Sequence, residues 1–170
     1  EHINKTKIFG VYSLNDQPLD NDQESQLNRK IQKLIKNHDL VIVSDYGHGL
    51  ISDKTAKLIV KKSKFVAVNT QLNSTNLGFH VISKYIGANF ITINETEMRH
   101  ELRNKDDDRV SLIKILTKKL KSNYTHVTSG PEGSSIFNSS TNEIINCPAF
   151  ADKVIDKVGT GDSMLAILAI

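Results

Sequence analysis

The residues best suited to chemistry lie near the C-terminus, where DKVGTGDSMLAILAI (156–170) places two glycines and an acid just before an apolar run. Gly159 and Gly161 allow a sharp turn in which successive N–H groups point at one spot. At the positive end of a helix, such a turn holds an anion. Asp162 follows at once and is suited to accept a hydroxyl proton while these amides stabilise a transferring phosphoryl group. The alternative is that Asp162 is only a capping acid at a helix start.

Segments with strand and helix patterns alternate along the chain, which predicts an α/β fold. We expect strands over 7–14, 40–43, 65–70, 89–94 and 124–130, a hairpin over 134–148, and helices over 23–37, 51–63, 79–86, 95–104, 109–122 and 159–170. Ser52 is predicted to cap the second of these helices. The last helix is so apolar that we expect it to be buried. The order predicts a Rossmann-like, mostly parallel sheet flanked by helices, with right-handed crossovers.

Ligands of such sheets bind beyond the carboxyl ends of the strands. The segments that follow predicted strands therefore converge on one edge of the sheet, and they are DYGHG, VNTQ, NETE, TSGPEG and GTGD. This convergence predicts one functional site built from segments that are far apart in the sequence.

Composition excludes several classes of protein. The 170 residues fit one domain, and the net charge of +3 comes from scattered lysines that are typical of solvated helix faces, so no nucleic-acid partner is expected. No apolar stretch approaches a membrane span, and the N-terminus lacks the apolar core of a signal peptide. The single cysteine, Cys147, excludes an internal disulfide and is predicted to be a partly buried structural thiol. We expect a cytoplasmic protein.

Three motifs in order resemble the ribokinase-like (PfkB-type) carbohydrate kinases. DKVGTGDSM is similar to the family's D-x-x-G-A-G-D signature, NETE (94–97) to its N-x-x-E motif, and VTSGPEG (127–133) to its T-x-G-x-x-G motif. The resemblance covers roughly residues 40–170 and implies ATP-dependent phosphorylation of a sugar or sugar phosphate. Both chain ends look cut, so we expect the C-terminal part of one kinase domain, an incomplete ribokinase-like core with little or no activity alone.

The resemblance implies that Asp162 is the general base, with the backbone N–H groups of Gly159, Thr160 and Gly161 as an anion hole. Asn94 and Glu97 would organise Mg²⁺ through water, although the same spacing also forms a helix capping box.

The resemblance also implies residues that contact ATP and residues that lie near the sugar. Thr128, Gly130, Gly133 and Asn69 would contact ATP, and Asp45, Gly47 and Gly49 would line the space between sugar and phosphates. Turns and loops without ligand are the alternatives for all of them.

Within the family, SDYGHG (44–49) is most similar to the D-Y-G-K-G stretch of bacterial heptose-7-phosphate kinases. His48 stands where those kinases often carry lysine, and VNTQ (68–71) stands in place of their D-P-K. The sugar, a fused nucleotidyltransferase domain and a homodimer of the longer protein stay open.

Three rival functions stay open beside the kinase. The first is a family member without catalysis that serves as a nucleotide-binding or regulatory module. The second is a basic α/β module that binds nucleic acid, suggested by the pI of about 8.9. The third is an enzyme that binds a dinucleotide. The absence of a G-x-G-x-x-G motif after the first strand argues against it.

Overall fold

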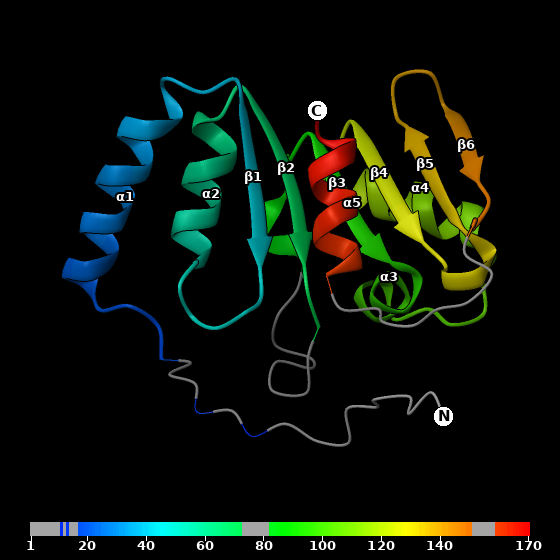
Figure 1. The fold of residues 1–170 in the computed structure, drawn as a ribbon, viewed down its shortest axis with the longest axis horizontal. Coiled ribbons are helices and arrows are strands. Elements are labelled where there is room, and N and C mark those ends of the chain that lie inside the picture. The colour runs from blue at the N-terminus through cyan, green and yellow to red at the C-terminus, as the bar shows by residue number, and fades with distance from the viewer. Residues whose placement is uncertain (1–10, 12, 14–16, 73–81, 151–158) are drawn as a thin grey trace, which may run out of the picture.

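A single six-stranded sheet organises the molecule in the computed structural model, which describes residues 11, 13, 17–72, 82–150 and 159–170. The strands are β1 Leu40–Asp45, β2 Phe65–Thr70, β3 Phe90–Asn94, β4 Tyr124–Thr128, β5 Ser134–Asn138 and β6 Glu143–Cys147. They follow one another in numerical order; β1 to β4 run parallel, and β5 and β6 are antiparallel (Figure 1). The mostly parallel α/β sheet is as the sequence predicts, and the expected strand 7–14 lies largely outside the described residues.

Every α-helix except the last begins at a residue whose side chain caps it. The helices are α1 Asn21–Ile35, α2 Asp53–Lys62, α3 Glu95–Leu102, α4 Arg109–Leu120 and α5 Thr160–Leu168, with 3₁₀ turns η1 Ile82–Tyr85 and η2 Gly130–Glu132. Asp20 and Gln23 form a capping box at α1, and the hydroxyl of Ser52 accepts from the Thr55 N–H at α2, as predicted. None of the described helices is long and apolar enough to cross a bilayer.

Two cores of unequal size lie on the two faces of the sheet. Helices α1 to α4 cover one face, where they bury the main core with alternate residues of the strands. Because successive strand residues point to opposite faces, Val66 and Val68 enter this core and Ala67 enters the other. The smaller core contains Ala67, Phe90 and Leu165, and α5 covers it (Figure 1).

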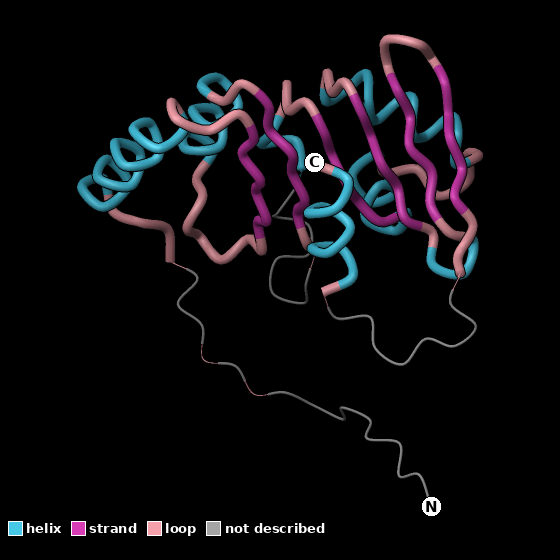
Figure 2. Tube along the Cα trace, turned by 45° about the horizontal axis from the view of Figure 1, so that its top comes forward, coloured by secondary structure: helices cyan, strands magenta, loops and turns pink. Residues whose placement is uncertain are grey.

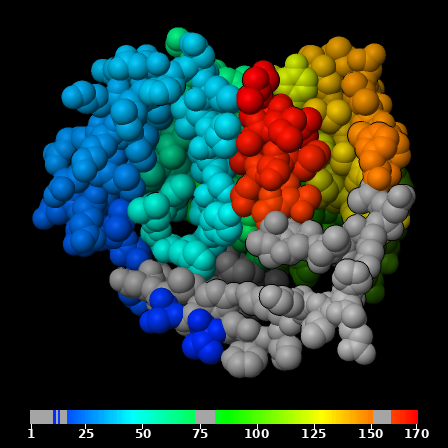
Figure 3. All heavy atoms as spheres, viewed as in Figure 1, coloured from blue at the N-terminus to red at the C-terminus, as the bar shows by residue number. Residues whose placement is uncertain are grey.

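Helix α5 is the one helix on its face in the described part of the chain, and it lies over β2 and β3, between β1 and the β5–β6 hairpin (Figures 2 and 3). The prediction of a buried helix is wrong, because Leu165 alone among the residues of α5 is buried. Ile167 is 70% exposed. The apolar sequence of this helix therefore exceeds what the sheet beneath it covers.

The loop from β4 to β5 depends on a glycine. Gly133 has φ 83° and ψ −135°, and a Cβ added there would lie 2.0 Å from the carbonyl oxygen of Cys147. The Ser129 N–H donates to the Gly133 carbonyl across the loop (2.8 Å). Cys147 itself is exposed, so the prediction of a partly buried thiol is wrong; it ends the outermost strand of the described sheet.

A buried ion pair ties the end of β1 to η1. Asp45 is 5% exposed, and its carboxylate accepts from the hydroxyl of Tyr85 (2.6 Å) and pairs with the ammonium of Lys84 (2.7 Å). Lys84 also donates to the Ile51 carbonyl (2.9 Å). Burial alone would raise the pKa of Asp45, but the hydrogen bonds from Lys84, Tyr85 and the Gly47 N–H outweigh it and hold that pKa below its ordinary value.

Substitution Gly133→Ala should lower the free energy of unfolding by about 3 kcal/mol or more, because the new methyl group meets the backbone of the Cys147–Ala149 segment. The matched control is Gly130→Ala, where φ is 55° but nothing lies within 4 Å of the added Cβ. That control should lose only about 1 kcal/mol of left-handed strain. Urea unfolding measures both, and equal losses would contradict the close approach at Gly133.

Substitution Asp45→Asn should destabilise the protein by about 3 kcal/mol at pH 7, because Lys84 keeps a charge without its partner. The folded pKa of Asp45 is lowered, so its contribution is present above the unfolded value of about 4 and is lost as the pH falls through the folded value.

The difference between wild type and variant in urea unfolding should therefore shrink below about pH 4. A difference that stays constant down to about pH 3 would contradict the ion pair. Asp39→Asn is the control, because its pair with Lys64 is exposed and should leave the unfolding free energy unchanged.

Candidate active site

The start of α5 has the backbone geometry of an anion site. Gly159 is the N-cap with φ 78°, and it has no side chain that could cap the helix. The first intrahelical bond runs from the Ser163 N–H to the Gly159 carbonyl (3.0 Å), so the amides ahead of Ser163 point out of the N-terminal end, as at any helix start. Amides at such an end attract negative charge.

Asp162 is the third residue of α5, and its carboxylate is turned toward the sheet. Its Oδ1 accepts from the hydroxyl of Ser44 (2.7 Å) and from the side-chain amide of Gln71 (3.4 Å). Its Oδ2 accepts from the hydroxyl of Tyr46 (2.6 Å). The helix has no side-chain cap, so the capping alternative is not what the structure shows, and the acid stands beside the amides with its oxygens held by side chains.

The three donors were missed by reasoning from motifs alone. Ser44 belongs to β1, Tyr46 follows that strand directly, and Gln71 follows β2. All three lie at carboxyl ends of parallel strands, which is the signal that could have found them. The hydrogen bond to Asp162, and then partial burial, raise the pKa of Tyr46 above its ordinary value.

Beneath the start of α5, a row of polar residues crosses the sheet. The parallel register places these four side by side on neighbouring strands, and we call them the polar row: Ser44, Asn69, Thr92 and His126. The Asn69 amide donates to the Thr92 carbonyl (2.9 Å), and Thr92 Oγ1 lies 2.8 Å from His126 Nδ1. Burial lowers the pKa of His126 to about 4, so this ring is neutral at pH 7.

Asn69 faces the glycine turn of α5. It is 5% exposed, and its Oδ1 has no hydrogen-bond partner among the described residues. That oxygen lies 3.7 Å from the position that a Cβ on Gly161 would take. A buried acceptor without a partner is costly, so this atom fits a donor brought by a ligand or by water at the anion site. The role predicted for Asn69 in binding ATP stays a prediction.

Asn94 and Glu97 form the helix capping box that was expected as the alternative to a role in organising Mg²⁺. Asn94 Oδ1 accepts from the Glu97 N–H (2.8 Å), and Glu97 Oε2 accepts from the Asn94 N–H (3.1 Å). Glu97 Oε1 accepts from the Leu72 N–H (3.0 Å), which ties the segment after β2 to α3. Burial raises the pKa of Glu97, and these N–H groups oppose that shift.

Both Glu97 oxygens are thus already bound to backbone amides. No group of three or more acidic, histidine or cysteine side chains within the described ranges could hold a metal. A Mg²⁺ ion that contacts Glu97 through water and takes its remaining ligands from phosphates fits this arrangement, whereas a cage made by the described side chains does not.

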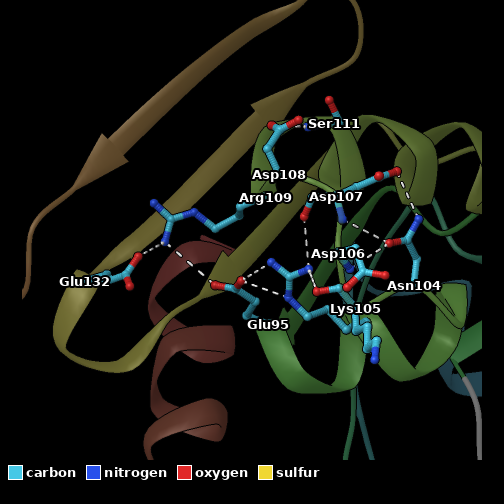
Figure 4. A network of polar contacts seen from close by, with 10 residues as sticks. Glu95, Asn104, Lys105, Asp106, Asp107, Asp108, Arg109, Ser111 and Glu132 are labelled. Atoms are coloured by element: carbon cyan, nitrogen blue, oxygen red, sulfur yellow. Dashed lines mark hydrogen bonds and ion pairs between the residues drawn. The ribbon is translucent and has the colours of Figure 1, made fainter.

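A charged network joins α3 and α4 to the TSGPEG loop (Figure 4). One guanidinium nitrogen of Arg109 lies 3.1 Å from Glu132 of the loop and 3.8 Å from Glu95. Glu95, which the motif reasoning did not use, also accepts from Arg99 Nη2 at 2.6 Å. The network places the start of α3 and the loop side by side at the ligand edge.

The other predicted residues lie at the same edge but are not brought into contact with Asp162. Thr128 pairs with Asn94 across β3 and β4, and Gly130 is exposed at η2. Gly47 and Gly49 lie half-buried in the loop after β1. The roles of these residues and of Gly133 toward ATP or sugar stay predictions.

Asp45 points away from Asp162, into the core on the other face of the sheet. Its carboxylate lies in the buried pair with Lys84, so the described contacts give it a structural role. Its predicted contact with substrate is untested.

Curated relatives of this chain include two proteins of the same name. The protein "Bifunctional protein HldE" of Campylobacter curvus is 32% identical over 149 residues, which is 85% of this chain and 30% of the relative. Its namesake in Helicobacter pylori is 31% identical over 161 residues, 90% of this chain and 33% of the relative. The chain therefore spans about a third of the length of these relatives.

Solved structures share the fold. Phosphofructokinase-2 from Escherichia coli in complex with potassium superposes with a TM-score of 0.70 at 15% identity, over 89% of this chain and 49% of that one. Ribokinase from Arabidopsis thaliana, complexed with ribose and ATP, gives 0.59 at 19% identity, over 90% of this chain and 46% of that one. The fold is thus that of the ribokinase-like kinases. The family of pfkB carbohydrate kinases matches residues 11–169, and the chain belongs to that family.

Proposed function

We propose that this chain carries the phosphoryl-transfer side of an ATP-dependent kinase that phosphorylates a sugar or sugar phosphate. The observation that carries the proposal is the placement of Asp162 in the first turn of α5, directly after residues 159–161, with its carboxylate held by Ser44 and Tyr46. A base and an anion hole at one helix start are what transfer to a hydroxyl requires.

Each part of the site has a separate task in this reaction. The amides of Gly159, Thr160 and Gly161 bind the developing charge on the transferred group, and Asp162 accepts the proton of the attacking hydroxyl. ATP supplies the phosphoryl group, and Mg²⁺ at Glu97 would neutralise phosphate charge through bound water. The cluster around Asp162 lies at the carboxyl ends of β1 and β2, where both substrates can approach from the ligand edge.

The substrate class follows from two supports. SDYGHG resembles the stretch D-Y-G-K-G of heptose-7-phosphate kinases, and the two curated relatives reported above bear the name HldE. We therefore propose a heptose phosphate as the acceptor.

The complete sugar site would need residues beyond this chain, which forms part of one kinase domain in this proposal. The chain spans about a third of the length of the relatives that it matches, and this supports the proposal.

Substitution Asp162→Asn in the full-length protein should lower kcat by about 10²- to 10⁴-fold, because the amide cannot accept the hydroxyl proton. The affinity for ATP should be retained, since the anion-binding amides belong to the backbone. Measurement combines ADP release, with a panel of sugars and sugar phosphates, and titration calorimetry with ATP.

The control is Asp53→Asn, the same change in the first turn of α2, and it should leave kcat unaltered. Unchanged turnover in Asp162→Asn would overturn the assignment of the base. A wild-type protein that binds ATP without turning over any acceptor would instead support the rival, a family member that has lost catalysis.

A further inference from the structure

The loop after β1 sends two neighbouring side chains in opposite directions. Asp45 is 5% exposed and enters the buried pair with Lys84, whereas Tyr46 is 42% exposed and lies on the side of Asp162. Consecutive residues of an extended chain point to opposite faces, so the burial of one fixes the direction of the other.

The backbone at Tyr46 is held from both sides. Asp45 Oδ1 accepts from the Gly47 N–H (2.9 Å), which closes a turn around Tyr46. The same carboxylate is anchored by Tyr85 and Lys84, and Lys84 also binds the carbonyl of Ile51 farther along the loop. The buried cluster therefore sets the position of Tyr46 independently of the contact with Asp162.

Tyr46 and Ser44 donate hydrogen bonds to different oxygens of the Asp162 carboxylate. Tyr46 donates to Oδ2 (2.6 Å) and Ser44 to Oδ1 (2.7 Å), and two such bonds oppose rotation of the carboxylate plane. Hydrogen bonds to an ionised acceptor are short and about twice as strong as neutral ones. Oδ1 also accepts from the Gln71 amide (3.4 Å), whereas Oδ2, which accepts from Tyr46, keeps lone-pair capacity for a further donor, such as an acceptor hydroxyl of the substrate.

We propose that Tyr46 is a positioning residue that holds the Asp162 carboxylate toward the attacking hydroxyl, with the buried Asp45–Lys84 pair setting the place of Tyr46. This inference rests on the proposed function for the role of Asp162 as the base. The contact between Tyr46 and Asp162 can be tested without any turnover.

The first experiment reads the contact directly. Protein labelled with 3-fluorotyrosine gives a fluorine resonance for Tyr46, which is assigned because it disappears in Tyr46→Phe. The bond to Asp162 raises the pKa of Tyr46. Replacing the charged acceptor in Asp162→Asn should therefore move the titration of this resonance to lower pH. An unchanged titration would overturn the proposal.

The second experiment reads the consequence for transfer. Tyr46→Phe should lower kcat about tenfold and leave the KM for ATP unchanged, because a carboxylate held by one bond fewer spends less time in the productive orientation. The control is Tyr124→Phe. It removes a hydroxyl at the start of β4, which is the end of the strand away from the ligand edge, and it should alter neither constant.

A kcat of Tyr46→Phe equal to that of wild type would also overturn the proposal. Failure of the proposed function looks different. In that case Asp162→Asn leaves turnover unchanged, or no acceptor is phosphorylated at all, while the fluorine titration still decides whether Tyr46 is bound to Asp162.

Discussion

The candidate site depends on a change from apolar to polar between two rows of the sheet. On the face covered by α5, one row across β1 to β4 consists of Ile42, Ala67, Phe90 and Tyr124, and two residues later comes the polar row. Leu165 packs on the apolar row, so the N-terminal turn of α5 lies over the polar one. Burial of one side chain thereby brings Ser44 and Asp162, 118 residues apart, into hydrogen-bond contact.

The parallel order of β1 to β4 makes this arrangement possible. Every one of these strands ends at the same edge, and in-register pairing carries the row from Ser44 to His126 without a break. The opposite face of the same strands is apolar and packs on α1 to α4, so the sheet is rigid where the site needs it. The residues of the site can therefore be polar without removing apolar side chains from the main core.

Sequence patterns predicted the elements and the edge, but not all of the contacts. The 3.6- and 2-residue periods, the cap at Ser52 and the box at Asn94–Glu97 are local, and each formed as expected. The pairing of Tyr46 with Asp162 could not be predicted, because the direction of Tyr46 is set by Lys84 and Tyr85 of another element. The same buried pair explains why Asp45 faces away from Asp162.

The contact that Gln71 makes with Asp162 offers a physical reason for the sequence VNTQ at this position. Gln71 is the last residue of VNTQ (68–71), the segment that differs from the D-P-K of the family pattern, and its side-chain amide donates to Asp162 Oδ1 (3.4 Å). The donors observed around this carboxylate are two hydroxyls and an amide, and all are neutral, whereas Lys84 is paired with Asp45. A lysine would add an ion pair to a base that has to accept a proton during transfer. A glutamine keeps the hydrogen bond and leaves the charge of Asp162 uncompensated.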